Sequence, residues 1–171
     1  GPIISKEAFY KLKDYIESAS IDGRNIIQAQ NYIDDRYVPP TIIEIESLSE
    51  LESEQFGPIL HLMKFKSGNV QGVVEEINKL NYGLTLGVHT RVESRADEIA
   101  NAANVGNVYI NRDIVGAVVG VQPFGGEGLS GTGCKAGGPN YLSQFVNEQV
   151  VSKNVVAFGG NTELLNLQTE E

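Results

Sequence analysis

The chain has 171 residues, of which 41% are hydrophobic and 20% charged, enough for one buried core and unlike a disordered polypeptide. Its 13 basic and 22 acidic side chains give a net charge of −9, which phosphate backbones and anionic lipids would repel, so this segment is not expected to bind nucleic acid. No apolar run approaches the ~20 residues of a transmembrane helix and no signal-peptide pattern is present. We therefore expect a cytoplasmic setting without a membrane span.

Cysteine and histidine are too sparse for a disulfide or a metal site. Cys134 is the only cysteine, and His61 and His89 have no neighbouring Cys or His, so we predict no metal. The adjacent Lys135 would favour a thiolate at Cys134, but no histidine lies near it in the sequence to act as a base. We predict that Cys134 is structural and that the chain contains no catalytic residue.

The N-terminal half alternates between helical and extended patterns. Hydrophobic spacing predicts a helix over residues 6–19 with Ser5 as its N-cap. Residues 37–45 are extended, and their two prolines favour an edge or irregular strand. A helix over residues 70–80 lies between strands over 59–65 and 84–90, which predicts one βαβ unit. A second helix over 94–103 and a strand over 108–111 follow, so the alternation predicts an α/β fold with a parallel sheet.

Residues 112–139 show neither period and contain nine glycines. We predict a long structured loop with a functional role, since loops of this length are uncommon in compact domains. A short helical stretch is expected over 141–145 and a strand over 150–158. The tail, residues 159–171, is expected to be loose unless a partner subunit covers it.

A dinucleotide fingerprint, G-x-G-x-x-G, occurs at residues 126–131. Such a fingerprint needs a strand before it and a helix that opens within it. Pro123 precedes the motif, and a run with three glycines follows it, which cannot start a stable helix. We therefore reject a Rossmann-type site here.

Glu54 and Phe56 precede a glycine–proline turn and a strand. The turn would hold Glu54 in one direction, where its carboxylate could accept hydrogen bonds from two ribose hydroxyls, with the Phe56 ring covering the nucleotide. The alternative is a solvated acidic turn, because glutamates surround it. The residues alone do not decide between the two.

Gly116 and Ala117 are small residues within the long loop, so a ligand could approach their main chain, whose N–H groups could bind a carboxylate. The alternative is a plain turn. Phe124, between Pro123 and two glycines, is either a core anchor for the loop or an apolar wall for a substrate chain. The hydrophobic period does not distinguish these.

Four motifs follow one another along the chain. They are Glu54-Gln55-Phe56-Gly57-Pro58, Asn81-Tyr82-Gly83-Leu84, Gly106-Asn107-Val108-Tyr109-Ile110-Asn111, and Pro123-Phe124-Gly125-Gly126 with Ser130-Gly131. In this order and spacing they resemble the aldehyde dehydrogenase family. Residues 116–124 and 135–139 resemble its pyrroline-5-carboxylate (L-glutamate γ-semialdehyde) dehydrogenase branch. Gly159-Gly160-Asn161 with Leu164-Leu165 resembles the bifunctional proline utilisation A enzymes.

The resemblance implies a C-terminal fragment of an NAD-dependent enzyme of proline catabolism. Residues 1–145 would form the C-terminal part of the α/β catalytic domain, and residues 146–171 an oligomerisation strand and tail. In this family a cysteine thiolate attacks the aldehyde, hydride passes to NAD, and a glutamate activates the water that hydrolyses the acyl-enzyme. Both residues, and most of the cofactor domain, should lie upstream of Gly1, so the fragment alone should be inactive.

The resemblance also assigns roles within this chain. Glu54 would contact the nicotinamide-side ribose of NAD and Phe56 would lie beside the cofactor. The main chain of Gly116 and Ala117 would hold the carboxylate of glutamate semialdehyde, and Phe124 would pack on its aliphatic stem. The implied partners are the missing N-terminal part and further copies in a homo-oligomer. An upstream FAD-containing proline dehydrogenase domain and peripheral contact of the parent with the inner membrane face are compatible with the resemblance.

Two other functions remain open from the sequence. One is an autonomous, non-catalytic oligomerisation module. The other is a fragment of a dehydrogenase for another aldehyde, in which Gly116 and Ala117 form only a turn.

Overall fold

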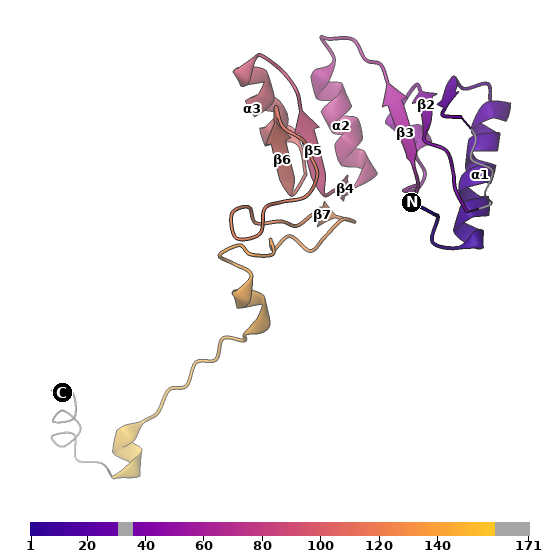
Figure 1. Cartoon of the computed structure of the whole chain (residues 1–171). Coiled ribbons are helices and arrows are strands. Elements are labelled where there is room, and N and C mark those ends of the chain that lie inside the picture. The colour runs from indigo at the N-terminus through magenta and orange to yellow at the C-terminus, as the bar shows by residue number, and fades with distance from the viewer. Residues whose placement is uncertain (31–35, 160–171) are drawn as a thin grey trace. The chain divides into compact units, whose positions relative to one another are not determined.

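The computed structural model describes residues 1–30 and 36–159 of the chain (Figure 1). The polypeptide divides into two compact units, Gly1–Gly138 and Pro139–Glu171. The first unit contains all the strands that the structure describes. The boundary expected between residues 145 and 146 stays a prediction.

The first helix, α1 (Lys6–Ile21), confirms the helix predicted over residues 6–19. Ser5 is its N-cap, because the Ser5 hydroxyl accepts a hydrogen bond from the backbone N–H of Ala8 at 3.1 Å and so satisfies one of the open donors of the first turn. The helix buries Leu12 and Ala19. It thereby covers one face of the first sheet.

That sheet has the order β1 (Ile26–Gln28), β2 (Thr41–Ile45), β3 (Ile59–Met63). β2 pairs antiparallel with β1 and parallel with β3, so the prediction of an edge strand is wrong for Thr41–Ile45. Residues 37–40, which contain the two prolines, are irregular, as the other alternative predicted. The prolines lie before the strand, and its ladder begins at Thr41, whose N–H donates to the carbonyl of Pro58 at 2.9 Å. A central strand therefore loses no donor to proline. β1 has only three residues, and no strand was predicted there.

The core of this sheet is small and apolar. Ala19, Ile43 and Ile45 form a buried cluster, and Ile43 is fully buried. Alternate residues of β2 point into it, as a strand covered on one face requires. Buried Thr41 is satisfied, because its hydroxyl donates to the carbonyl of Pro39 at 2.8 Å and accepts from the side chain of Gln28 at 2.9 Å.

The second half of the first unit contains the predicted helix–strand alternation. Its elements are α2 (Val70–Leu80), β4 (Tyr82–Gly83), β5 (Thr85–Val88), α3 (Glu93–Ala102) and β6 (Asn107–Ile110). β5 and β6 pair in parallel, and α3 connects them. The strands on either side of α2 lie in separate sheets, so the βαβ unit predicted there is wrong as a single sheet. β3 pairs with β2 and β5 with β6; the parallel crossover that does form is the one around α3.

The glycine-rich segment after β6 is a loop, as predicted. It contains β7 (Glu127–Gly128), which pairs antiparallel with β4. Over residues 126–131, where the dinucleotide fingerprint was rejected, the chain forms β7 and a turn closed by the hydrogen bond from the N–H of Ser130 to the carbonyl of Glu127 at 3.1 Å.

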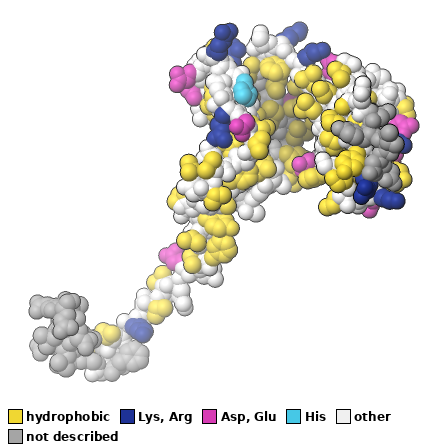
Figure 2. Space-filling model, viewed as in Figure 1, with side chains coloured by type: hydrophobic (Ala, Val, Ile, Leu, Met, Phe, Trp, Pro, Cys, Tyr) yellow, Lys and Arg dark blue, Asp and Glu magenta, His cyan; other side chains and the backbone are white. Residues whose placement is uncertain are grey.

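The second unit has two short 3₁₀ helices, η2 (Leu142–Phe145) and η3 (Val155–Phe158). The first confirms the helical stretch predicted over 141–145. The strand predicted over 150–158 is wrong for the single chain: the described part of this unit has no strand, and Asn154 caps η3 by accepting from the N–H of Val156 at 3.2 Å. A strand needs a paired neighbour, and residues 1–30 and 36–159 place none beside this segment. Val150, Val151, Val155 and Val156 are exposed. Figure 2 shows hydrophobic side chains on the surface of this unit.

The tail predicted to be loose lies, from residue 160 onward, outside the described residues. Within residues 1–30 and 36–159, no helix has both the length and the apolar character needed to cross a bilayer.

Candidate functional site

Glu54 and Phe56 lie on the rim of one hollow in the first unit. The hollow has a volume of about 640 Å³ and lies between the start of β3 and the region of β4, β5 and Leu129. Phe56 is 80% exposed. Glu54 is also exposed, and its carboxylate has no hydrogen-bond or ion-pair partner among the residues that the structure describes. Both side chains are therefore available to a ligand at this rim.

The turn after Phe56 is fixed against α1. The N–H of Gly57 donates to the carbonyl of Gln55 at 2.9 Å, and the N–H of Ile59 donates to the carbonyl of Gly57 at 2.8 Å. A Cβ at residue 57 would lie 2.5 Å from Cδ1 of buried Leu12, so a larger residue would force Leu12 to move. The turn thus sets the position of the Glu54–Phe56 segment.

A network of polar side chains lies near the hollow. Glu50, at the end of η1 (Leu48–Glu50), accepts from the N–H of Ser47 at 2.9 Å and pairs with Arg24 at 2.9 Å. The hydrogen bond from the Ser47 backbone, more than any other contact, holds the pKa of the Glu50 carboxyl below its ordinary value. A charged Glu50 keeps this short helix capped.

His61 lines the hollow from β3. Its Nε2 and the hydroxyl of Tyr15 share a hydrogen bond of 2.8 Å, and the two rings meet edge to face. Burial first, and the charge of Arg24 second, lower the pKa of His61 below its ordinary value of 6.5. Burial raises the pKa of the Tyr15 hydroxyl. The neutral pair therefore joins α1 to the wall of the hollow.

The lowered pKa of His61 predicts an acid-sensitive fold. Below pH 6.5 the unfolded chain binds a proton at residue 61 that the folded chain does not, so the free energy of unfolding falls as pH falls until the folded pKa is passed. We expect His61→Gln to flatten the pH dependence of the urea unfolding midpoint between about pH 5 and 7. The exposed His89 provides the control: an equal flattening in His89→Gln would contradict the assignment.

The main chain at Gly116 and Ala117 is held from β6. Gly116 adopts a positive φ of 65°, and the hydroxyl of buried Tyr109 donates to its carbonyl at 2.8 Å. The N–H of Gly116 donates to the carbonyl of Ile114 at 3.1 Å. The N–H of Ala117 has no partner within the described part of the chain. One of the two expected donors is therefore open and the other makes a bond within the loop.

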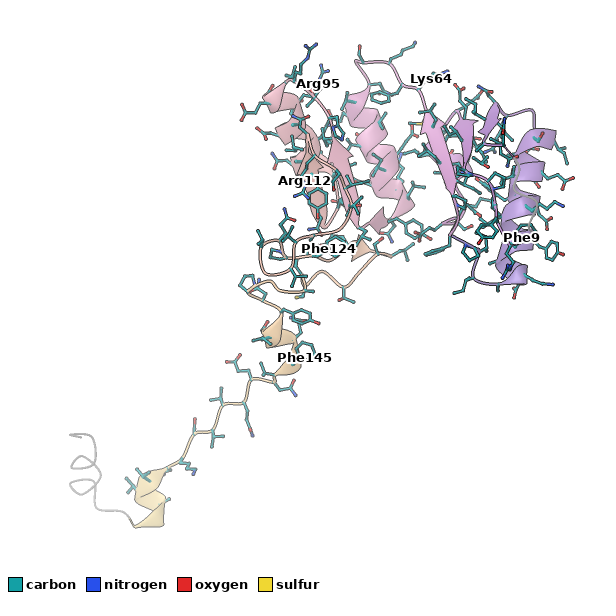
Figure 3. All side chains as sticks on the ribbon, viewed as in Figure 1. Phe9, Lys64, Arg95, Arg112, Phe124 and Phe145 are labelled. Atoms are coloured by element: carbon teal, nitrogen blue, oxygen red, sulfur yellow. The ribbon has the colours of Figure 1, made fainter. Side chains whose placement is uncertain are left out.

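Tyr109 is fixed in turn by a cation. Cζ of Arg112 lies 4.6 Å from the centroid of the Tyr109 ring, a distance at which the guanidinium is attracted to the face of the ring. Figure 3 labels Arg112 beside β6. The contact with Arg112 thus holds the Tyr109 ring, and the hydroxyl of that ring binds the Gly116 carbonyl.

Phe124, labelled in Figure 3, is half-buried. Two sets of hydrogen bonds hold the backbone at and around it. It exchanges hydrogen bonds with Ala136, at 3.1 Å from its N–H and 2.8 Å to its carbonyl. On either side of it, the side chain of Asn107 donates to the carbonyl of Pro123 at 3.0 Å and accepts from the N–H of Gly125 at 3.1 Å. The segment that carries the ring therefore has a fixed place relative to β6.

The structure thus places the predicted residues in two groups. Glu54 and Phe56 share the hollow, whereas Gly116, Ala117 and Phe124 lie on the loop that is tied to β6. Sequence reasoning gave no role to Asn107 or Tyr109. The only signal was their place in the Gly106–Asn111 motif, and nothing in that motif indicates their partners.

The ammonium of Lys135 pairs with groups of the loop and not with the thiol of Cys134. Its ammonium donates to the carboxylate of Glu127 at 2.7 Å and to the carbonyl of Gly133 at 2.9 Å, so it braces the loop. Cys134 is partly buried. Residues 1–30 and 36–159 contain no group of three His, Cys, Asp or Glu side chains that could hold a metal ion.

Comparison with known proteins gives the chain's relatives. Residues 1–151 match the sequence model of the aldehyde dehydrogenase family. The chain is 48% identical to the bifunctional protein PutA of Klebsiella aerogenes over 157 residues, which are 87% of this chain and 12% of that protein. It is 39% identical to 1-pyrroline-5-carboxylate dehydrogenase of Staphylococcus haemolyticus, over 90% of this chain and 30% of that protein. The chain thus spans a minor part of each relative's length.

Solved structures of proteins with the same names are also similar to this chain. A mutant of Bradyrhizobium japonicum proline utilization A superposes with a TM-score of 0.82 at 44% identity, covering 92% of this chain and 16% of that one. A 1-pyrroline-5-carboxylate dehydrogenase from Thermus with bound NAD superposes with a TM-score of 0.74 at 34% identity, covering 85% of this chain and 28% of that one.

Proposed function

Because the chain belongs to the aldehyde dehydrogenase family, we propose that it is the C-terminal part of an NAD-dependent enzyme that oxidises L-glutamate γ-semialdehyde to L-glutamate in proline catabolism. The observation that carries the proposal is the similarity, over most of this chain, to proteins named 1-pyrroline-5-carboxylate dehydrogenase. Pyrroline-5-carboxylate and the semialdehyde interconvert by ring closure and hydrolysis. The semialdehyde is the aldehyde that such an enzyme would oxidise.

The hollow at Glu54 and Phe56 fits one end of a dinucleotide. The open Glu54 carboxylate can accept two ribose hydroxyls in charge-assisted hydrogen bonds, and the exposed Phe56 ring offers an apolar flank. The similar Thermus enzyme was solved with bound NAD, which supports NAD as the cofactor. NAD, when bound, supplies the acceptor for the hydride; this chain's part is to hold its ribose.

The loop at Gly116 and Ala117 is suited to bind the carboxylate end of glutamate semialdehyde. The open N–H of Ala117 can donate to the substrate carboxylate, and the N–H of Gly116 can exchange the carbonyl of Ile114 for the same anion. Phe124 then packs along the aliphatic stem. The attacking cysteine thiolate and the glutamate that activates water are assigned to residues N-terminal to this segment.

The proposed partners follow from the size of the relatives and from the second unit. The proteins named PutA are several times longer than this chain, which supports a preceding N-terminal part. We propose that this part has room for an FAD-containing proline dehydrogenase domain. The exposed valines of residues 150–156 support pairing with a second copy, hence a homo-oligomer. A cytoplasmic setting completes the proposal.

NADH formation tests the proposal. The complete polypeptide should form NADH from NAD and glutamate semialdehyde, whereas the isolated 171-residue chain should not. Glu54→Gln should raise the KM for NAD about 10-fold or more, because hydrogen bonds to a charged group are worth about 1.5–3 kcal/mol, with a smaller effect on the KM for the aldehyde. Glu52→Gln, an exposed neighbour, is the control. An unchanged KM for NAD in Glu54→Gln would remove Glu54 from the site.

A further inference from the structure

Two side chains of β6 hold the two parts of the proposed substrate site. Asn107 binds the Pro123 carbonyl and the Gly125 N–H, on either side of Phe124. Tyr109 binds the Gly116 carbonyl in the carboxylate-binding loop. The two residues are two positions apart on one strand, so their side chains leave the same face of β6.

We infer that β6 acts as a ruler for the substrate. Asn107 and Tyr109 are positioning residues: they fix the separation between the main chain that takes the carboxylate and the Phe124 ring that flanks the stem. This inference rests on the proposed function. Two residues of a strand span about 7 Å, and that distance cannot stretch or shrink without breaking the ladder to β5. The ruler therefore selects the chain length of the aldehyde.

Contacts along β6 keep the separation between Asn107 and Tyr109 constant. All four residues of β6 are in register with β5 in a parallel ladder. At its start, a Cβ on Gly106 would lie 1.8 Å from the carbonyl oxygen of Gly125, so the strand and the Phe124 segment touch backbone to backbone. At its end, Arg112 packs on the ring of Tyr109. Neither the Phe124 segment nor the Gly116 loop can therefore shift along the strand.

The proposed substrate has homologues that differ from it only in chain length. Glutamate semialdehyde carries its carboxylate and its aldehyde at opposite ends of a short chain. Aspartate semialdehyde is one methylene shorter and 2-aminoadipate semialdehyde one longer. With the carboxylate anchor and the Phe124 wall held at one separation, a stem of one length packs along the wall and presents its aldehyde carbon to the upstream nucleophile. A single methylene is commonly worth about 10- to 200-fold in kcat/KM.

The test uses the complete polypeptide with Tyr109→Phe and Asn107→Ala. Tyr109→Phe removes only the hydroxyl that binds Gly116, and Asn107→Ala only the clamp around Phe124. kcat and KM are measured for the three semialdehydes and for butanal, a neutral aldehyde of similar length. We expect the KM for glutamate semialdehyde to rise about 3- to 10-fold in Tyr109→Phe, which loses one hydrogen bond, and at least as much in Asn107→Ala, which loses two. The preference over the shorter and longer homologues should fall several-fold, and Tyr109→Phe should leave butanal within about two-fold.

The controls separate positioning from general stability. Tyr10→Phe and Asn104→Ala change exposed side chains that make no hydrogen bond within the described residues, and should leave the length preference unchanged. A purely structural role would lower kcat for all four aldehydes equally and keep KM and preference constant, which would overturn the ruler. If Asn107→Ala does not fold, Asn107→Ser takes its place. No NADH from the wild-type polypeptide with glutamate semialdehyde would instead overturn the proposed function itself, and the ruler with it.

Discussion

Ala117→Leu is expected to lower kcat/KM for L-glutamate γ-semialdehyde at least about 100-fold, because the side chain would fill the approach to the donors assigned to the substrate carboxylate, and each hydrogen bond to a charged group is worth about 1.5–3 kcal/mol. The N–H of Ala117 is open in the structure. A Cβ at Gly116 would meet no atom within 4 Å, so the loop itself has room for a ligand.

The measurement compares the semialdehyde with butanal, which has no carboxylate. We expect butanal to retain its kcat/KM within about five-fold, since it never used these donors. Val119→Leu changes a fully exposed residue of the same loop and serves as the control. Parallel losses on both aldehydes in Ala117→Leu would show that the loop acts on folding or on the cofactor and not on the carboxylate, and would favour a dehydrogenase for another aldehyde.

Gly106→Ala is expected to destabilise the folded protein by about 3 kcal/mol or more, at the upper end of the cost of overpacking. The new Cβ would lie 1.8 Å from the carbonyl oxygen of Gly125 and 2.8 Å from its carbonyl carbon. Both are backbone atoms, so no side-chain rotation can relieve the clash. The start of β6 and the Phe124 segment would have to separate.

Thermal unfolding of the complete polypeptide measures this loss. Gly68→Ala is the matched control, because a Cβ there would meet no atom within 4 Å, and an exposed substitution of this kind usually changes stability by less than about 0.5 kcal/mol. Similar melting temperatures for Gly106→Ala and the wild type would mean that the loop and β6 are not in backbone contact. Glutamate semialdehyde activity should fall together with the folded fraction in Gly106→Ala.

The sequence predicted the elements whose signals are local. All three α-helices lie within a few residues of their expected ranges, because spacing and caps such as Ser5 are properties of neighbouring residues. Strand pairing is not local. The place of β2 in the middle of its sheet depends on β1 and β3, and the separation of β3 from β5 depends on which partner each finds. The hydrophobic pattern after residue 150 predicts a strand, but a strand requires a partner, and the described part of the chain provides none.

The same distinction applies to the site. Glu54 and Phe56 share a hollow because they are neighbours in the chain, which the sequence shows directly. The family resemblance, carried by four ordered motifs, is confirmed by the match over residues 1–151. The link between Phe124 and the Gly116 loop was not predictable, because it passes through Asn107 and Tyr109, side chains of a strand that precedes both.

Under the proposed pairing of the exposed valines of residues 150–156 with a second copy, assembly follows mass action. A segment whose backbone groups can complete a ladder only on another copy is ordered in proportion to how often two copies meet. Dilution would return Val150 and Val151 to water and leave their N–H and C=O groups to proteases and to unintended partners. Under that proposal, the order of residues 150–156 rises and falls with the concentration of the protein.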